Sequence, residues 1–189
     1  MIELRDIHYA RVGTRDLDTA EHFATQVMGL EKVERTADRL YLRSDHRHHT
    51  LCYFLGDPSE QIIAFDLTSW QALDAAYDYL QAQGVPCGRG SAEEAADRHV
   101  QGFIWLLDPT GNRIELLARP HDSARRYFPS RDAGVTGFGH VGLCTTDPVR
   151  DQAFWLQHFN AMVSDWIGPC PLMRVNPRHH QMALFASTR

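Results

Sequence analysis

The sequence predicts an α+β protein built from tandem β-α-β-β-β modules, and two observations predict this class. First, short apolar or alternating segments and amphipathic helices follow one another in the order strand, helix, strand, strand, strand, and this order recurs along the chain. Second, nine pairs of identical residues lie 131 positions apart without a gap, which indicates a duplicated unit. The pairs are Thr14 and Thr145, Asp16 and Asp147, Phe23 and Phe154, Gln26 and Gln157, Arg43 and Arg174, Arg47 and Arg178, His48 and His179, His49 and His180, and Phe54 and Phe185.

The first module begins with a weakly alternating strand over residues 7–14. Asp16 is suited to cap the helix that follows, and Gly29 is suited to the left-handed position just past the end of that helix. Three short strands complete the module, over residues 30–35, 39–44 and 49–56.

The second module starts with an apolar strand over residues 61–67. Ser69 is placed to cap the next helix, and Gly84 is placed to end it. Residues 87–98 contain two glycines and an Ala/Glu cluster, so we expect a polar excursion there. Two strands, over residues 100–107 and 113–118, are joined by the strong turn Asp108-Pro109-Thr110-Gly111-Asn112.

A third module follows a connection rich in proline and arginine. A strand over residues 138–145 precedes a helix capped by Asp147, with Pro148 at its first position, and Asn160 takes the place that Gly29 holds in the first copy. Strands are expected near residues 161–167, 171–175 and 180–186. We therefore predict a complete module pair over residues 1–119, a linker over 120–135 and a single, unpaired module over 136–189, whose bare sheet must be covered by further chain or by another subunit.

Composition excludes some classes of function. The chain of 189 residues is 43% hydrophobic with a formal net charge of -5, which fits a globular protein and argues against nucleic acid as a partner. No apolar run approaches the roughly 20 residues that span a bilayer, and the first residues do not resemble a signal peptide, so we expect a cytoplasmic protein. The four cysteines form no CxxC motif, and we expect them to be reduced and mostly in the core.

Histidines at matching repeat positions are the main candidates for chemistry. If His140 lies on the first strand of the third module and His180 on its last strand, both can point to the concave face, whereas His179 points away by strand alternation. Two histidines with one carboxylate form the facial triad suited to Fe(II) and oxygen chemistry. A surface strand end is the alternative interpretation of a His-His pair. The first copy has Tyr9 where the third module has His140.

Glu115 is an acid inside an otherwise apolar strand. Burying an unpaired carboxylate is costly, so this residue needs either a ligand role or a satisfying partner. Both interpretations stay open: a carboxylate metal ligand, or a glutamate on a half-exposed face.

Taken together, these motifs resemble the vicinal oxygen chelate superfamily, and within it a C-terminally truncated type I extradiol catechol dioxygenase. The resemblance rests on Gly139-His140-Val141, the helix capped by Asp147, His179-His180-x-x-Ala183-Leu184 and the Asp-Pro-x-Gly-Asn-x-x-Glu turn that ends at Glu115. It implies the glyoxalase/extradiol dioxygenase fold, with two modules in each domain. It also implies a C-terminal domain that binds Fe(II), or alternatively Mn(II), through two histidines and one glutamate, and a related N-terminal domain without metal.

By this resemblance, His140 is the first metal ligand and His180 the second, while the third, a glutamate, lies beyond the chain end. Tyr9, His49 and Glu115 are the relic metal positions of the N-terminal domain. The second-sphere histidine that the family places shortly before the second ligand has no counterpart in residues 163–178. Aromatic side chains that either line the substrate pocket or belong to the core are Trp155, Trp166 and Phe185.

The implied activity is ring cleavage of a catechol-type aromatic diol with O2 by a homo-oligomer, with neither nucleic acid nor membrane as a partner. Because the carboxylate ligand is missing, we expect the 189 residues alone to bind Fe(II) weakly and to cleave catechols slowly or not at all. Two alternatives belong to the same superfamily: a non-catalytic small-molecule-binding protein of the bleomycin-resistance type, and a glyoxalase-type isomerase or lyase.

Overall fold

The computed structural model describes residues 1–132 and 134–187, which form two compact units. Unit 1 comprises Met1–Ile7, Ala64–Arg119 and Gly139–Arg189, and unit 2 comprises His8–Ile63 and Pro120–Phe138. Unit 2 therefore holds most of the first module with the connection after residue 119, and unit 1 holds most of the second module and the third. The predicted domain boundaries stay a prediction.

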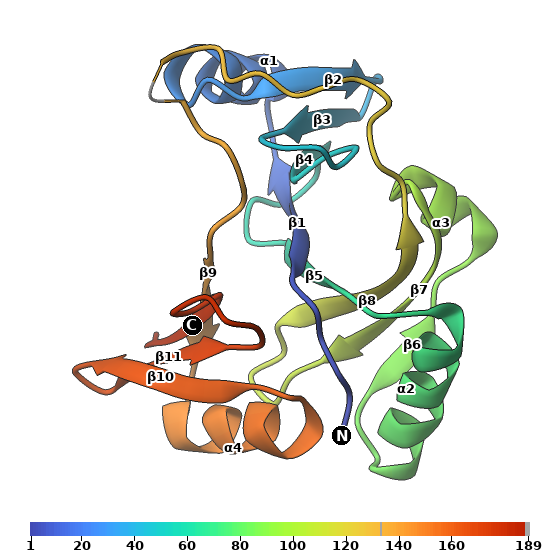
Figure 1. Ribbon diagram of the computed structural model, residues 1–189, viewed down its shortest axis with the longest axis vertical. Helices are drawn as coiled ribbons and strands as arrows, with labels where there is room; N and C mark the ends of the chain where they lie inside the picture. Colours follow the sequence, from blue (N-terminus) through green and yellow to red (C-terminus); the bar gives the residue numbers. More distant parts are fainter. Residues whose placement is uncertain (133, 188–189) are drawn as a thin grey trace. The chain divides into compact units, whose positions relative to one another are not determined.

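The three predicted modules are present, which confirms the fold class (Figure 1). The first consists of β1 (Ile7–Thr14), α1 (Leu17–His22), a π-helical turn (Phe23–Val27), β2 (Glu31–Arg35), β3 (Arg39–Arg43) and β4 (Leu51–Leu55). The second consists of β5 (Gln61–Asp66), α2 (Trp70–Ala82), β6 (Cys87–Arg89), α3 (Ala92–Asp97), β7 (Val100–Leu107) and β8 (Arg113–Pro120). The third consists of β9 (Val141–Thr145), α4 (Pro148–His158), β10 (Met162–Ile167), β11 (Cys170–Arg174) and β12 (Met182–Ala186).

In unit 2 the strand order is β2-β3-β4-β1, with β1 parallel to β4 and the other pairs antiparallel. Asp16 caps α1 as predicted, and Gly29 has the predicted left-handed conformation at a φ of 78°. The predicted helix is present, and its last turn, Phe23–Val27, is π-helical. The hydroxyl of Thr25 donates to the Glu21 carbonyl over 2.8 Å and so competes with the regular backbone pairing there.

The second module contributes strands in the order β5-β8-β7-β6. The polar excursion expected over residues 87–98 contains a short strand and a helix, β6 and α3. Gly90 permits close packing in this segment, since a Cβ atom at this position would lie 2.0 Å from the ring of Phe103. Ser91 and Glu94 form a reciprocal capping box at the start of α3, which explains why a helix begins among these polar residues.

The third module is a separate four-stranded sheet in the order β10-β11-β12-β9, with α4 against one face (Figure 1). Asp147 caps α4 and Pro148 occupies its first turn, as predicted. Asn160 does not replace Gly29 in the left-handed conformation, since it is absent from the non-glycine residues with positive φ. Its side chain instead accepts from the Leu4 backbone N–H over 2.8 Å and donates to the Leu4 carbonyl over 3.0 Å. The N-terminal segment also satisfies this helix end, because the Ile2 backbone N–H donates to the carbonyl of His158, the last residue of α4, over 2.8 Å.

Within unit 1, the third module is joined to the second by a buried polar cluster and an aromatic contact. Asp151 is fully buried and accepts hydrogen bonds from the hydroxyls of Thr145, over 2.6 Å, and Thr110. Asn112, in the predicted turn, donates to the Cys144 carbonyl over 2.8 Å and so fixes β9. Fully buried aromatic rings seal the junction, namely those of Trp155 and Phe65, whose centroids lie 5.8 Å apart.

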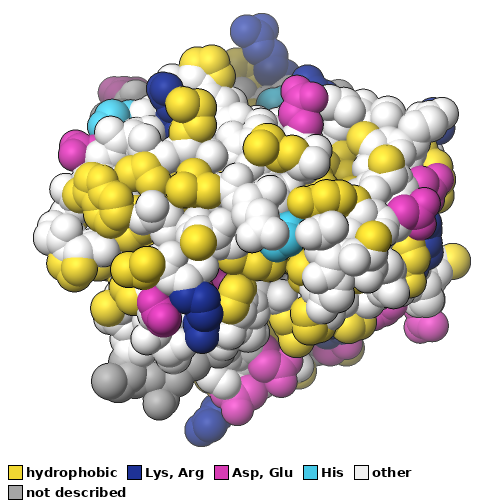
Figure 2. All heavy atoms as spheres, turned by 90° about the horizontal axis from the view of Figure 1, so that it is seen from below, with side chains coloured by type: hydrophobic (Ala, Val, Ile, Leu, Met, Phe, Trp, Pro, Cys, Tyr) yellow, Lys and Arg dark blue, Asp and Glu magenta, His cyan; other side chains and the backbone are white. Residues whose placement is uncertain are grey.

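The cysteines are less buried than expected. Only Cys52 is buried, whereas Cys144 is exposed, and the four form no disulfide within residues 1–132 and 134–187. No helix in these described ranges is long and apolar enough to cross a membrane. Figure 2 shows hydrophobic side chains, in yellow, among polar ones on the face seen from below. The exposed hydrophobic side chains of the third module include Val149, Met162, Trp166, Ile167 and Phe185.

Candidate metal site

His140 and His180 lie close together in unit 1, as the repeat predicted. Their ring centroids are 4.7 Å apart and the rings are inclined by 41°. The prediction that both lie on strands was wrong, because His140 occupies the loop directly before β9 and His180 lies in the loop before β12, two residues from its start. The two strands pair in parallel with Val141 opposite Met182, so the residues that precede them start from neighbouring points of the sheet.

Backbone hydrogen bonds set this approach. Val141 directly follows His140, and Gln181 directly follows His180. The Val141 N–H donates to the Gln181 carbonyl over 3.0 Å. The first module repeats the same bond, from the Ala10 N–H to the Thr50 carbonyl over 3.0 Å. The two copies of the duplicated unit therefore share this backbone hydrogen bond at corresponding positions.

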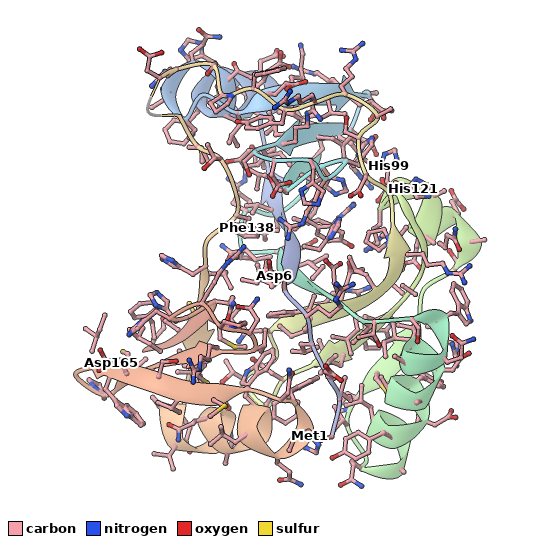
Figure 3. The ribbon with its side chains drawn as sticks, in the orientation of Figure 1. Met1, Asp6, His99, His121, Phe138 and Asp165 are labelled. Atoms are coloured by element: carbon pink, nitrogen blue, oxygen red, sulfur yellow. The ribbon has the colours of Figure 1, made fainter. Side chains whose placement is uncertain are left out.

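His179 does not turn away from His180, which corrects the prediction from strand alternation. The Nδ1 atoms of the two rings lie 2.9 Å apart and the rings are nearly perpendicular, at 83°. Alternation fails because the chain is not extended here: residues 175–179 form a series of bends before β12. On its other side, Nε2 of His179 lies 3.9 Å from a carboxylate oxygen of Asp165, near the outer end of β10 (Figure 3).

This contact assigns a task to each nitrogen of His180. A proton on Nδ1 of His180 that is donated to Nδ1 of His179 leaves the lone pair of Nε2 available for a ligand. Histidines that bind metals generally donate their second ring N–H in this way, which fixes the tautomer and the ring orientation. His179 can therefore act as the acceptor that orients His180, a role that the sequence did not reveal.

The electrostatic environment favours the neutral form of His180. Its pKa lies below the ordinary value because burial penalises the charged ring, and the nearby rings of His140 and His179 lower it further. Neutral imidazole is the form that binds metals. His180 is half-buried and His140 is exposed, so solvent can reach the pair.

In unit 2, the matching positions carry Tyr9 and His49. Their rings are stacked, with centroids 4.9 Å apart and an interplanar angle of 17°, and both residues are buried. His48 stands to His49 as His179 stands to His180, with 3.2 Å between the Nδ1 atoms. The two copies thus share one geometry, but the first holds a phenol in place of an imidazole.

Glu115 is fully buried and carries an ion pair with Arg98. The guanidinium donates from Nε and from Nη2 to the two carboxylate oxygens, each over 2.8 Å. This arrangement matches the interpretation of Glu115 as a satisfied glutamate, although in a fully buried position. Arg98 was not predicted as the partner of Glu115. The sequence feature that could have indicated it is the capping-box pattern from Ser91 to Glu94, because this pattern predicts a short helix with Arg98 at its C-terminal end.

No third ligand joins the histidine pair within residues 1–132 and 134–187: no Asp, Glu or Cys side chain forms a group of three with His140 and His180. Of the aromatic candidates, Trp155 is fully buried core, whereas Trp166 is 51% exposed. Phe185 is partly exposed and packs over Gly142, two residues after His140, where an added Cβ atom would lie 2.9 Å from its ring.

The model of the Glyoxalase/Bleomycin resistance protein/Dioxygenase superfamily matches residues 6–116. The chain belongs to this superfamily. Among similar members, the biphenyl-2,3-diol 1,2-dioxygenase of Sphingomonas paucimobilis is 27% identical over 97% of this chain and 67% of its own length. The iron-dependent extradiol dioxygenase of Rhodococcus jostii (strain RHA1) is 28% identical over 96% of this chain and 68% of its own length.

A solved structure of a superfamily member supports the same grouping. The structure of BphC, described as a halotolerant catechol dioxygenase, superimposes with a TM-score of 0.86 at 25% identity, over 98% of this chain and 66% of that one. The chain thus spans about two thirds of the length of the relatives that it matches. The predicted resemblance to the superfamily and to its extradiol dioxygenases is confirmed.

Proposed function

We propose that this superfamily member works as an extradiol ring-cleaving dioxygenase on a catechol-type aromatic diol with O2, with His140 and His180 as two ligands of the catalytic metal. The observation that carries the proposal is the convergence of these two imidazoles, with ring centroids 4.7 Å apart. The matching place in the first copy holds a tyrosine instead, stacked on His49. The named activities of the relatives point to the same reaction, since they are extradiol and catechol dioxygenases.

The donor set fits Fe(II). Two imidazoles plus one carboxylate, with further positions left open, form the ligand set of non-haem iron enzymes that use oxygen. The lowered pKa of His180 favours the neutral ring, which is the form that binds a metal. We propose Fe(II) as the metal, with Mn(II) as the alternative, because both accept this ligand set. When bound, the metal would supply a Lewis-acidic centre at which the diol and O2 can be brought together.

The remaining tasks fall to residues of this chain. We propose that His179 orients the ring of His180 by accepting a hydrogen bond from its Nδ1–H. The Gln181 carbonyl accepts a hydrogen bond from the Val141 N–H and so links the two loops. Phe185 offers an apolar ring next to Gly142, on the strand that follows His140, where an aromatic diol can stack. We propose Phe185 as a wall of the substrate pocket on this basis.

The carboxylate ligand is proposed to come from outside the described residues, because no acidic side chain among them joins the histidine pair. Tyr9, His49 and Glu115 are proposed as the corresponding positions of the first domain, without a metal. Glu115 already neutralises Arg98, so its carboxylate is committed to an ion pair.

We propose a cytoplasmic location and a homo-oligomeric state. Four cysteines without a disulfide among the described residues support a reducing compartment. Exposed apolar side chains of the third module, among them Met162 and Ile167, support burial against further protein.

A ring-cleavage assay tests the proposed activity. The 189-residue protein is loaded with Fe(II) without air and then exposed to air with 2,3-dihydroxybiphenyl or catechol, and the yellow product is followed. We expect slow turnover, because two imidazoles without a negative ligand hold a divalent ion weakly. A form or complex that adds a carboxylate ligand is expected to turn over faster.

His140→Ala is expected to abolish the product, and His49→Ala is the matched control that leaves the rate unchanged. Turnover that survives His140→Ala would show that the metal is held elsewhere. Absence of product even in a form that supplies the carboxylate would favour a binding protein of the same superfamily, and conversion of a thiol adduct instead would favour a glyoxalase-type enzyme.

A further inference from the structure

The loop between β11 and β12, residues 175–181, carries His179 and His180 and is held by its own side chains. Oδ1 of Asn176 accepts from the Arg178 backbone N–H over 3.0 Å and also from the side-chain amide of Gln181. Oε1 of Gln181 accepts from the Val175 N–H over 3.0 Å, and Gln181 is fully buried. The loop is therefore closed on itself around Asn176 and Gln181.

A carboxylate far away in the sequence also holds this loop. Asp6, in the N-terminal segment of unit 1 (Figure 3), lies 3.2 Å from Arg178 at each of its two oxygens, Oδ1 to Nη1 and Oδ2 to Nη2. The side-chain amide of Asn176 donates to Oδ1 of Asp6 over 3.2 Å and to the Arg5 carbonyl over 2.9 Å. The N-terminal segment thus contacts the loop through both an ion pair and two amide hydrogen bonds.

In the matching loop of the first module, the same arginine has a carboxylate partner within the loop. Arg47, which corresponds to Arg178, pairs with Asp45 over 2.6 Å within its own loop. Asp45 also accepts from the Arg47 backbone N–H over 2.9 Å, as Asn176 does from Arg178. Asp45 and Asn176 occupy the same repeat position.

The difference between the two copies is therefore one functional group. An aspartate at this position both caps the turn and neutralises the arginine, whereas Asn176 caps the turn but carries no charge. The positive charge of Arg178 is met instead by Asp6. In the third module, the ion pair of this arginine therefore joins the loop of residues 175–181 to the N-terminal segment.

We propose that Asp6 is a positioning residue for the metal site, which fixes the loop of His179 and His180 through Arg178 and Asn176. The inference rests on the proposed function in that His180 is taken as a metal ligand. Arg178 is about half-exposed, and an exposed ion pair alone contributes little. Asp6 acts because it binds Arg178 through both oxygens and orders Asn176 at the same time.

The effect is measured first without any metal. Asp6→Asn is expected to raise the hydrogen–deuterium exchange of the amides of residues 178–181 by about tenfold, because the loop loses its outside anchor. The melting temperature and the exchange of β9 and β12 are expected to stay close to those of the unmodified protein. Arg178→Gln, which removes the other end of the ion pair, is expected to have the same effect.

The second measurement is Co(II) binding by calorimetry, with the untagged protein. Loss of a residue that orients a ligand typically weakens metal binding by tenfold or more, and Asp6 acts one step further away, so we expect Asp6→Asn to raise the Kd about three- to tenfold. Asp38→Asn is the matched control, since it removes an exposed ion pair with Arg39 elsewhere in the chain. It is expected to change neither quantity.

A rescue variant separates this proposal from a general weakening of the fold. Asn176→Asp copies the first module and gives Arg178 a local carboxylate, so adding it to Asp6→Asn is expected to restore slow exchange and Co(II) affinity. Unchanged exchange in both Asp6→Asn and Arg178→Gln would overturn the positioning role. If the unmodified protein binds no Co(II), or binds it equally in His140→Ala, the proposed metal site fails, while the exchange measurements still decide the role of Asp6.

Discussion

Replacing Glu115 by alanine is expected to lower the free energy of unfolding by about 3–5 kcal/mol, because it leaves the buried guanidinium of Arg98 without its carboxylate. Both side chains are almost fully buried, and two hydrogen bonds of 2.8 Å join them. Urea unfolding followed by circular dichroism measures the loss, which should appear as a lower midpoint at an unchanged slope.

Two variants test the cause of this loss. Glu93→Ala, which removes an exposed glutamate of α3, is expected to change the unfolding free energy by less than about 0.5 kcal/mol. Removal of both charges together, as Glu115→Leu with Arg98→Met, is expected to recover much of the stability, because neither charge is then buried alone. A loss below about 1 kcal/mol for Glu115→Ala would show that the ion pair does not hold β8 to the end of α3.

Replacing Trp155 by alanine is expected to cost about 3–5 kcal/mol of unfolding free energy, because it opens a cavity at the junction of the second and third modules. The side chain is fully buried between Phe65, at 5.8 Å, and Phe159, at 4.9 Å between ring centroids. Thermal unfolding should show the loss as a lower midpoint.

Trp166→Ala is the matched control, since this tryptophan is 51% exposed at the end of β10. It is expected to leave the unfolding midpoint nearly unchanged. Equal losses in the two variants would contradict the assignment of Trp155 to the core and of Trp166 to the surface, which the sequence alone left open.

The repeat explains why the sequence could predict the histidine pair. Parallel pairing of the first and last strands recurs in both copies, and the same backbone hydrogen bond follows Tyr9 and His140. Once the repeat is recognised, the proximity of His140 and His180 follows from topology. The helix caps at Asp16 and Asp147 were predictable because capping depends only on neighbouring residues.

Features that depend on distant residues were not predictable. Gly90 counted toward the polar excursion expected over residues 87–98, but it leaves room for the ring of Phe103, which lies 13 positions later. Asn160 looked like a helix-ending residue, yet it binds the backbone of Leu4 at the other end of the chain. The orientation of His179 could not be predicted from strand alternation, because this residue lies in a loop. The side chain of Gln181 closes that loop through hydrogen bonds to residues 175 and 176.

A Co(II) titration of the untagged protein, followed by the histidine ring signals in NMR spectra, tests whether His140 and His180 hold the metal. We expect the paramagnetic ion first to broaden the ring signals of His140 and His180, and we expect His140→Ala and His180→Ala each to weaken binding by at least about tenfold. His49→Ala, at the matching position of the first module, should bind Co(II) as the unmodified protein does. Binding that persists undiminished in His140→Ala and His180→Ala would contradict the central claim that these two histidines hold the metal.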